Sequence, residues 1–186
     1  MPIPLILLLS LLIALARGGR LSNLAHISIR YPILLFLPFA IQLIAFSPVG
    51  DILINNILLA QILYLVSMAL AIFALWLNRH LPGVLWIALG LVLNTLVITL
   101  NGGFMPVSAA ARQFAGQPPL TERDMNIIPM TDATLLPWLG DILPLPAFVP
   151  FATVFSIGDV FIAIGGVIFI QKSMVLAKPR ADHETE

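Results

Sequence analysis

Five long runs of apolar residues, separated by short polar segments, dominate the chain. They cover residues 2–16, 31–46, 52–77, 84–100 and 157–176. A helix needs roughly 20 apolar residues to cross a hydrocarbon core about 30 Å thick, and it bonds all of its own backbone polar groups there. The pattern therefore predicts a bundle of about five transmembrane helices, of which the first is short for a full crossing.

The overall composition favours a membrane protein over a soluble one. Of the 186 residues, 60% are hydrophobic and only 10% are charged, and the mean hydropathy is +1.04. A soluble domain carries about 25% charged residues because its surface faces water. We therefore predict an all-α integral membrane protein that forms one domain over residues 1–186 and is surrounded by the lipid bilayer.

The basic residues predict the orientation of the bundle. Most of them lie between the first and second runs, between the third and fourth, or near and beyond the end of the fifth: Arg17, Arg20, Arg30, Arg79, Lys172, Lys178 and Arg180. Short loops rich in Lys and Arg stay in the cytoplasm. We expect a multi-pass protein of the bacterial cytoplasmic (inner) membrane, with its N-terminus outside and its C-terminus in the cytoplasm.

The first run has an alternative interpretation as a signal peptide. Residues 5–13 are apolar, and residues 14–16 read Ala-Leu-Ala, which is typical of a cleavage site. Cleavage would leave three arginines outside, against the charge rule, and the run has no basic start. We therefore interpret it as a membrane helix and keep cleavage as the alternative.

The charge balance and the residue types exclude several functions. The net charge is zero and no Lys/Arg cluster is present, which argues against nucleic acid as a partner. The chain has no cysteine, so it has no disulfide, thiolate or cysteine-ligated metal. The three histidines lie outside the apolar runs and show no metal-ligand spacing. We therefore expect no cofactor and no metal.

A long proline-rich segment, residues 102–156, separates the last two runs and is predicted to lie outside the membrane. A connection of this length is uncommon unless it has a function. Asn101, Gly102 and Gly103 at its start have two interpretations. They can end the preceding helix, or their backbone N–H groups can stabilise an oxyanion in a site.

Asp159 is the strongest candidate for chemistry because a polar residue near a membrane span is costly. Ser156 stands three residues before it. This spacing predicts a helix that begins at Ile157, with Ser156 as the N-cap and Asp159 bonded back to it. Of the polar residues within the spans, Asn94 is expected to approach Asp159.

A second carboxyl group, Asp141, lies 18 residues before Asp159. The apolar, proline-stiffened stretch between them can fold back over the start of the last helix. Two carboxyl groups brought together there can share one proton, so that one activates water and the other protonates the leaving group. We predict Asp141 and Asp159 as catalytic residues, and a site wall of Asn94, Asn101, Gly102, Gly103 and Ser156. The alternative is that both aspartates only cap and orient the loop.

Residues 151–159 read FATVFSIGD and continue into a glycine-containing helix. This stretch resembles the Phe-Asn-x-Ala-Asp motif in the last helix of bacterial lipoprotein signal peptidases, with Ser156 in place of Asn and Gly158 in place of Ala. The resemblance covers the last quarter of the chain. It implies a membrane aspartyl peptidase whose catalytic residues are Asp141 and Asp159, and whose substrate is a lipid-anchored or membrane-embedded protein.

Four segments, residues 15–21, 101–107, 139–146 and 155–159, are together similar to a bacterial membrane family called domain of unknown function 5317. That resemblance extends over nearly the whole chain. It implies a shared fold and supplies no activity.

Three functional classes stay open from the sequence. The first is an aspartyl hydrolase at the outer membrane face. The second is a non-catalytic accessory or assembly subunit of a larger membrane complex. The third is a small transporter, for which a polar path should continue from Asp159 to the inner face and for which no inverted repeat is visible.

Overall fold

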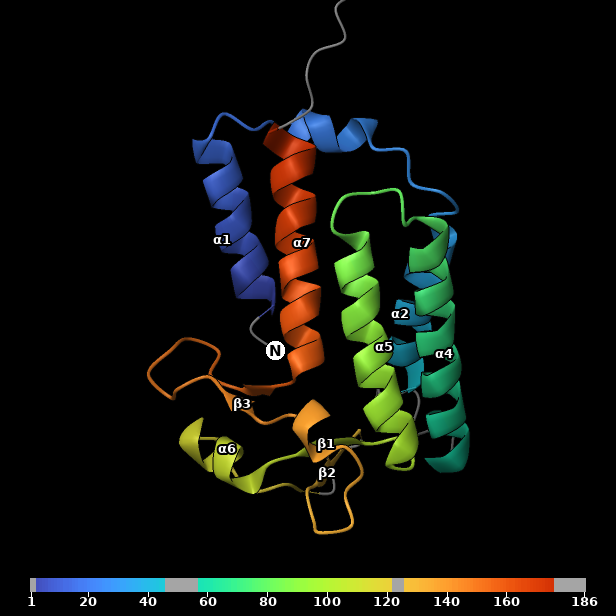
Figure 1. Cartoon of the computed structure of the whole chain (residues 1–186), viewed down its shortest axis with the longest axis vertical. Coiled ribbons are helices and arrows are strands. Elements are labelled where there is room, and N and C mark those ends of the chain that lie inside the picture. Colours follow the sequence, from blue (N-terminus) through green and yellow to red (C-terminus); the bar gives the residue numbers. More distant parts are fainter. Residues whose placement is uncertain (1–2, 46–56, 122–125, 176–186) are drawn as a thin grey trace, which may run out of the picture.

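The computed structural model describes residues 3–45, 57–121 and 126–175, which form a mostly helical protein (Figure 1). Five apolar helices form the bundle: α1 (Ile3–Ala16), α2 (Ile33–Ala45), α4 (Ile57–Leu77), α5 (Val84–Leu100) and α7 (Ile157–Val175). They confirm the helices predicted from the five apolar runs. Parts of those runs, residues 2, 46, 52–56 and 176, lie outside the described residues.

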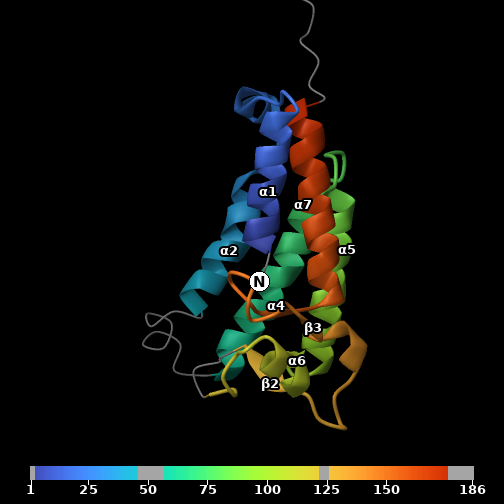
Figure 2. The ribbon, with the colours of Figure 1, turned by 90° about the vertical axis from the view of Figure 1, so that its left-hand side faces the viewer.

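Helix α7 is central to the bundle. It packs between α1 and α5, while α4 contacts α5 and α2 lies on α4 (Figures 1 and 2). Helices α4 and α7 are long and apolar enough to cross a membrane, and α1, α2 and α5 are shorter apolar helices. The start of α7, where the sequence places its main candidate, is therefore held by neighbours on two sides.

Glycines bring α5 and α7 close together at two levels. Gly83 faces Gly165 and, seven residues further along each antiparallel helix, Gly90 faces Gly158. A Cβ atom on Gly165 would lie 2.6 Å from the carbonyl oxygen of Gly83, and one on Gly158 would lie 2.7 Å from that of Gly90. Small residues at such contacts let two helix backbones approach. No larger residue fits this interface without moving a helix.

The described part of residues 102–156, here called the cover segment, lies against one end of the bundle (Figure 1, bottom). Its elements are β1 (Met105–Val107), α6 (Ala109–Phe114), β2 (Ile127–Pro129), η2 (Pro137–Leu139), β3 (Leu143–Pro144) and β4 (Val154–Phe155). Strands β1 and β2 pair in parallel, and β3 and β4 pair antiparallel. The protein is mostly helical, as predicted, but these two short strand pairs were not predicted. They satisfy backbone N–H and C=O groups of the cover segment that lie outside helices.

The opposite end of the bundle carries the basic residues. The short helix η1 (Leu21–His26) lies across this end (Figure 1, top). The basic residues of the described chain in this region, here called the basic end, are Arg17, Arg20, Arg30, Arg79 and Lys172. Buried Asn78 ties two of its loops together, because its Oδ1 accepts from the backbone N–H of Arg30 at 2.7 Å and its Nδ2 donates to the carbonyl of Arg30 at 2.9 Å.

Candidate active site at the start of α7

Helix α7 begins with a reciprocal pair of hydrogen bonds. The backbone N–H of Asp159 donates to Ser156 Oγ at 3.1 Å, and the backbone N–H of Ser156 donates to Asp159 Oδ2 at 3.2 Å. Both residues are buried, with Ser156 0% and Asp159 1% exposed. These bonds satisfy two of the N–H groups that a helix start leaves unpaired. The capping box and the helix start at Ile157 predicted from the sequence are confirmed.

Asn94 of α5 completes a buried polar network with this pair. Its Nδ2 donates to Asp159 Oδ1 at 3.0 Å, and its Oδ1 accepts from Ser156 Oγ at 2.8 Å. The prediction that Asn94 approaches Asp159 is therefore confirmed. The place that a Cβ atom on Gly158 would take is filled by the Asn94 amide. The close glycine contact is thus what lets three polar side chains meet between two apolar helices.

The backbone of the cover segment fixes Asp141 on both sides. The N–H of Asp141 donates to the carbonyl of Pro106 at 2.9 Å, and its carbonyl accepts from the N–H of Ser108 at 3.0 Å. Two residues later, Leu143 pairs with Phe155, which directly precedes Ser156. Pairing of β3 with β4 therefore brings the Asp141 segment back to the start of α7, as the sequence predicted.

The carboxyl group of Asp141 is in an unusual environment. Its Oδ1 is buried and has no hydrogen-bond partner in the described part of the chain. Burial and, secondarily, the negative charge of Asp159 raise the pKa of Asp141 to about 7. A buried charge without a partner is costly, so the neutral acid is favoured. At neutral pH, Asp141 can therefore supply a proton, whereas the Asp159 carboxylate is held by hydrogen-bond donors.

Tyr64 of α4 also belongs to this region, and sequence reasoning missed it. Its side chain is buried, lies within electrostatic range of both Asp141 and Asp159, and hydrogen-bonds with the Asn126 side chain. The available signal was a tyrosine, one of two in the chain, inside an otherwise apolar run. That signal alone does not separate a core residue from a site residue.

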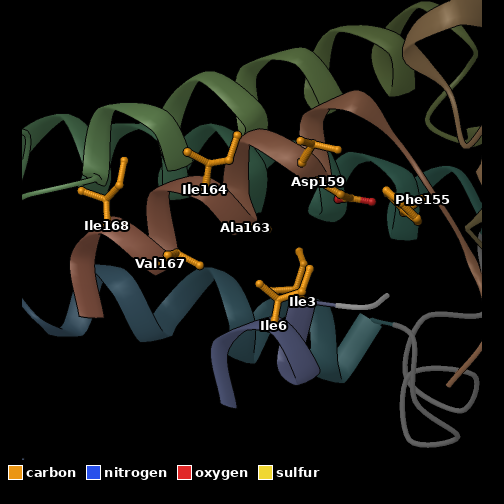
Figure 3. A pocket seen from close by; sticks show the side chains of 9 residues that line it. Ile3, Ile6, Phe155, Asp159, Ala163, Ile164, Val167 and Ile168 are labelled. Atoms are coloured by element: carbon orange, nitrogen blue, oxygen red, sulfur yellow. The ribbon is translucent and has the colours of Figure 1, made fainter. Parts of the chain in front are cut away.

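A cavity of about 320 Å³ runs between α1 and α7 and ends at Asp159 (Figure 3). Ile3 and Ile6 line it from α1, while Phe155 and Asp159 lie at one end and Ile168 at the other. Apart from Asp159, every lining residue is apolar. An apolar group can therefore lie along α7 with one end beside Asp159.

The other predicted wall residues lie at the end of α5 and have a different role. The backbone N–H of Asn101 donates to the carbonyl of Val97, and that of Gly103 to Ile98. The Asn101 side chain bonds the backbone of Leu135 through both its Nδ2 and its Oδ1. Gly102 and Gly103 have positive φ angles of 72° and 89°. This geometry supports the helix-ending interpretation, because two of the N–H groups that would bind an oxyanion are already used.

The described residues offer little for a metal. No group of three or more His, Asp or Glu side chains within them is placed to hold a metal ion.

The fold and site define a mostly helical protein with five apolar helices, a structured cover segment, and a buried Ser–Asp–Asn network at the start of its central helix. The chain belongs to the family of unknown function DUF5317, whose profile matches residues 26–171. Of the four segments that carried this resemblance, the one at residues 15–21 precedes the matched region, so the match is shorter than predicted.

A relative from Thermotoga maritima supports a longer correspondence. This protein, described as uncharacterized, is 28% identical over 184 residues, which cover 97% of this chain and 98% of the relative. No solved structure matches the chain. Nothing in these comparisons supports the resemblance to lipoprotein signal peptidases, so any peptidase activity has to be argued from the site alone.

Proposed function

We propose that the five apolar helices lie in the bacterial cytoplasmic membrane, with the cover segment outside and the basic end in the cytoplasm. In both α4 and α7, only 33% of the most apolar stretch of the helix is buried inside the protein. The core helix of a soluble protein is, in contrast, mostly buried. Large apolar side chains such as Phe36 (69%), Phe39 (68%) and Leu58 (61%) are exposed. A soluble monomer rarely exposes so much apolar surface. The basic end follows the rule for cytoplasmic loops.

We further propose that Asp141 and Asp159 form the catalytic pair of a membrane aspartyl hydrolase. The observation that carries this proposal is the Asp141 Oδ1 atom, which is buried and has no hydrogen-bond partner among the described residues. The pKa of this carboxyl group is raised to about 7, and the Asp159 carboxyl group lies within electrostatic range. Two titratable groups in such different environments are typical of an acid and a base in one site. A purely structural role does not explain why Asp141 Oδ1 is left without a hydrogen-bond partner among the described residues.

The proposed reaction is the hydrolysis of a peptide bond by one water molecule. The Asp159 carboxylate accepts a proton from water as the water oxygen bonds to the carbonyl carbon, while protonated Asp141 donates its proton to the carbonyl oxygen. The gem-diol then collapses. Its C–N bond breaks, Asp141 takes back one hydroxyl proton, and Asp159 gives its proton to the leaving amine nitrogen. Both carboxyl groups return to their starting states.

The cavity along α7 supports a substrate that is lipid-anchored or embedded in the membrane. Its surface is wholly apolar, and Asp159 contributes to it without exposing a polar atom. A substrate that enters from the bilayer would bury an apolar chain there and bring its scissile bond to the outer end of α7. Sites of this kind are mostly apolar with few polar groups.

A non-catalytic accessory role is the second candidate, and one observation favours it. Asp159 is already bonded to Asn94 and Ser156, so helix capping accounts for this residue without any chemistry. In that case the Asp141 carboxyl group would serve no purpose, and replacing it would leave every activity unchanged.

The two candidates separate in a cleavage assay. Wild type and Asp141→Asn would be purified, reconstituted in liposomes and incubated with a prolipoprotein, and the products measured by mass spectrometry. General acid–base groups contribute about 10²–10⁴-fold, so we expect the variant to lose at least about 100-fold in rate. Wild-type cleavage should fall as the pH rises through about 7, because Asp141 then loses the proton that it donates.

Asp132→Asn is the matched control, because Asp132 is an exposed carboxyl group of the same cover segment. It should cleave at the wild-type rate. Equal product from wild type and Asp141→Asn, or no product from wild type, would remove the peptidase proposal.

A further inference from the structure

Another cavity, lined in part by polar side chains, lies at the basic end, far from the two aspartates. Its volume is about 410 Å³, and it forms where η1, the turn between α4 and α5, and the last turns of α7 meet (Figure 1, top). Its polar lining consists of Asn23, His26, Ser28, His80, Lys172 and Ser173. Three segments that are distant in sequence thus contribute one ammonium group, two imidazole rings, two hydroxyl groups and an amide to one cavity.

No negative charge balances this region in the described part of the chain. The acidic residues there are Asp132, Asp141 and Asp159, and all three lie at the end of the bundle with the cover segment. The basic neighbours of the cavity that have side-chain partners use neutral ones. Arg17 donates to Gln171 at 2.7 Å, and the Arg79 guanidinium lies 4.6 Å from the centre of the Trp76 ring. The cavity therefore has a positive field that favours an anion.

The donors in the cavity suit a group with several acceptor oxygens. Lys172 carries a compact charge with three donor hydrogens, and Ser28 and Ser173 offer hydroxyl groups. His26 Nδ1 lies 2.9 Å from the carbonyl of Ser22, and His80 Nε2 lies 3.3 Å from that of Ser28. Each of these ring nitrogens donates to the backbone oxygen, so the second nitrogen of each ring can donate to a phosphate oxygen only in the imidazolium form.

We propose that this cavity binds a phosphate group. Phosphate carries a negative charge, and it has enough acceptor oxygens to bond donors from all three segments at once. The group can belong to an anionic phospholipid of the cytoplasmic leaflet or to a free phosphate. Basic pockets between membrane helices on the cytoplasmic side bind anionic headgroups, so the lipid source follows if the proposed membrane placement holds. Binding would link η1 and the α4–α5 turn to α7.

The test uses the purified full chain in a nonionic detergent and follows thermal unfolding by tryptophan fluorescence. The probes are phosphatidylglycerol, phosphatidylcholine as the lipid without net charge, and inorganic phosphate against chloride at equal ionic strength. A ligand that binds only the folded state raises the unfolding midpoint. We expect phosphatidylglycerol to raise the wild-type midpoint in a saturable manner and phosphatidylcholine to leave it unchanged.

Variants of the cavity make the test specific. Lys172→Gln should raise the half-saturating concentration of phosphatidylglycerol roughly fivefold, the effect expected for one basic group near an anionic surface. His80→Gln should also weaken binding, and Lys172→Arg should restore most of it. The matched control is Arg112→Gln, which removes a cation at the other end of the bundle and should change nothing.

Each outcome decides the proposal. If phosphatidylglycerol raises the unfolding midpoint, inorganic phosphate does not, and the rise depends on Lys172, the site is supported and its ligand is a lipid headgroup. If inorganic phosphate also raises the midpoint and that rise depends on Lys172, the site is supported and its ligand is a free phosphate. The proposal is overturned if neither probe shifts the midpoint, or if Arg112→Gln weakens the shift as much as Lys172→Gln. Should Lys172→Gln fail to fold, His80→Gln and Lys172→Arg carry the same comparison.

Discussion

Replacing Asp159 with alanine is expected to lower the free energy of unfolding by about 4 kcal/mol, because two buried donors would lose their acceptor. These donors are the Asn94 Nδ2 group and the backbone N–H of Ser156, and both residues are buried. The start of α7 would lose half of its capping box as well. For a chain of this length, the unfolding midpoint should fall by roughly 12 °C.

Thermal unfolding of the purified protein checks this prediction. Asp159→Asn should lose far less than Asp159→Ala, because its amide oxygen still accepts one hydrogen bond and the Asn94 amide can turn to pair with it. Asp132→Ala is the control for removal of an exposed carboxyl group and should unfold like wild type. If Asp159→Ala also unfolds at the wild-type temperature, the buried network contributes nothing to stability.

The second large effect is expected for Gly158→Ala, although it adds only one carbon atom. That carbon would overlap the Asn94 amide and lie 2.7 Å from the carbonyl oxygen of Gly90. Either α5 and α7 must separate or Asn94 must leave Asp159. Overpacking of this kind costs about 1–3 kcal/mol, and the disrupted hydrogen bonds add to it.

Unfolding of Gly158→Ala is compared with that of Ala69→Leu, which adds a larger apolar group at an exposed position of α4. We expect Gly158→Ala to unfold roughly 10 °C below wild type and Ala69→Leu to match wild type. Equal midpoints for Gly158→Ala and wild type would show that the two helices are not in close contact at this level.

The parts of the fold that local sequence determines were predicted well. A run of apolar residues is enough to predict a helix, and the spacing of Ser156 and Asp159 is enough to predict where α7 begins. The approach of Asn94 to Asp159 followed from their similar depth in neighbouring spans. The helices and the capping box depend on helix periodicity and on contacts over three residues, which a sequence shows directly.

Apart from the approach of Asn94 to Asp159, the parts of the fold that depend on distant segments were not predicted. The parallel pairing of β1 with β2 needs Met105 opposite Ile127, and nothing in either short segment specifies the other. The matching of Gly83 with Gly165 likewise appears only once the register of α5 against α7 is known. The basic cavity combines residues of three segments, none of which is distinctive alone.

The environment of Asp141 is the feature that most suggests function over stability. A folded chain rarely leaves a buried carboxyl oxygen without a partner, and exceptions tend to lie at functional sites. The folded-state pKa of Asp141 is about 7 and its ordinary value is 3.8. Between these pH values, the Asp141 carboxyl group is therefore protonated in the folded state and ionised in the unfolded state. Stability from this group is therefore fully present below about pH 4 and is lost as the pH rises through about 7.

The most direct test of the carboxyl pair is a titration of Asp141 itself. Infrared or carbon-13 spectra of protein labelled at the aspartate carboxyl groups would be recorded from pH 3 to 9, with the Asp141 signal identified by its loss in Asp141→Asn. We predict a pKa of about 7 for Asp141 in wild type, and a lower pKa in Asp159→Asn, where one negative charge is removed. A carboxyl group that titrates near 3.8 in both proteins would contradict the pair.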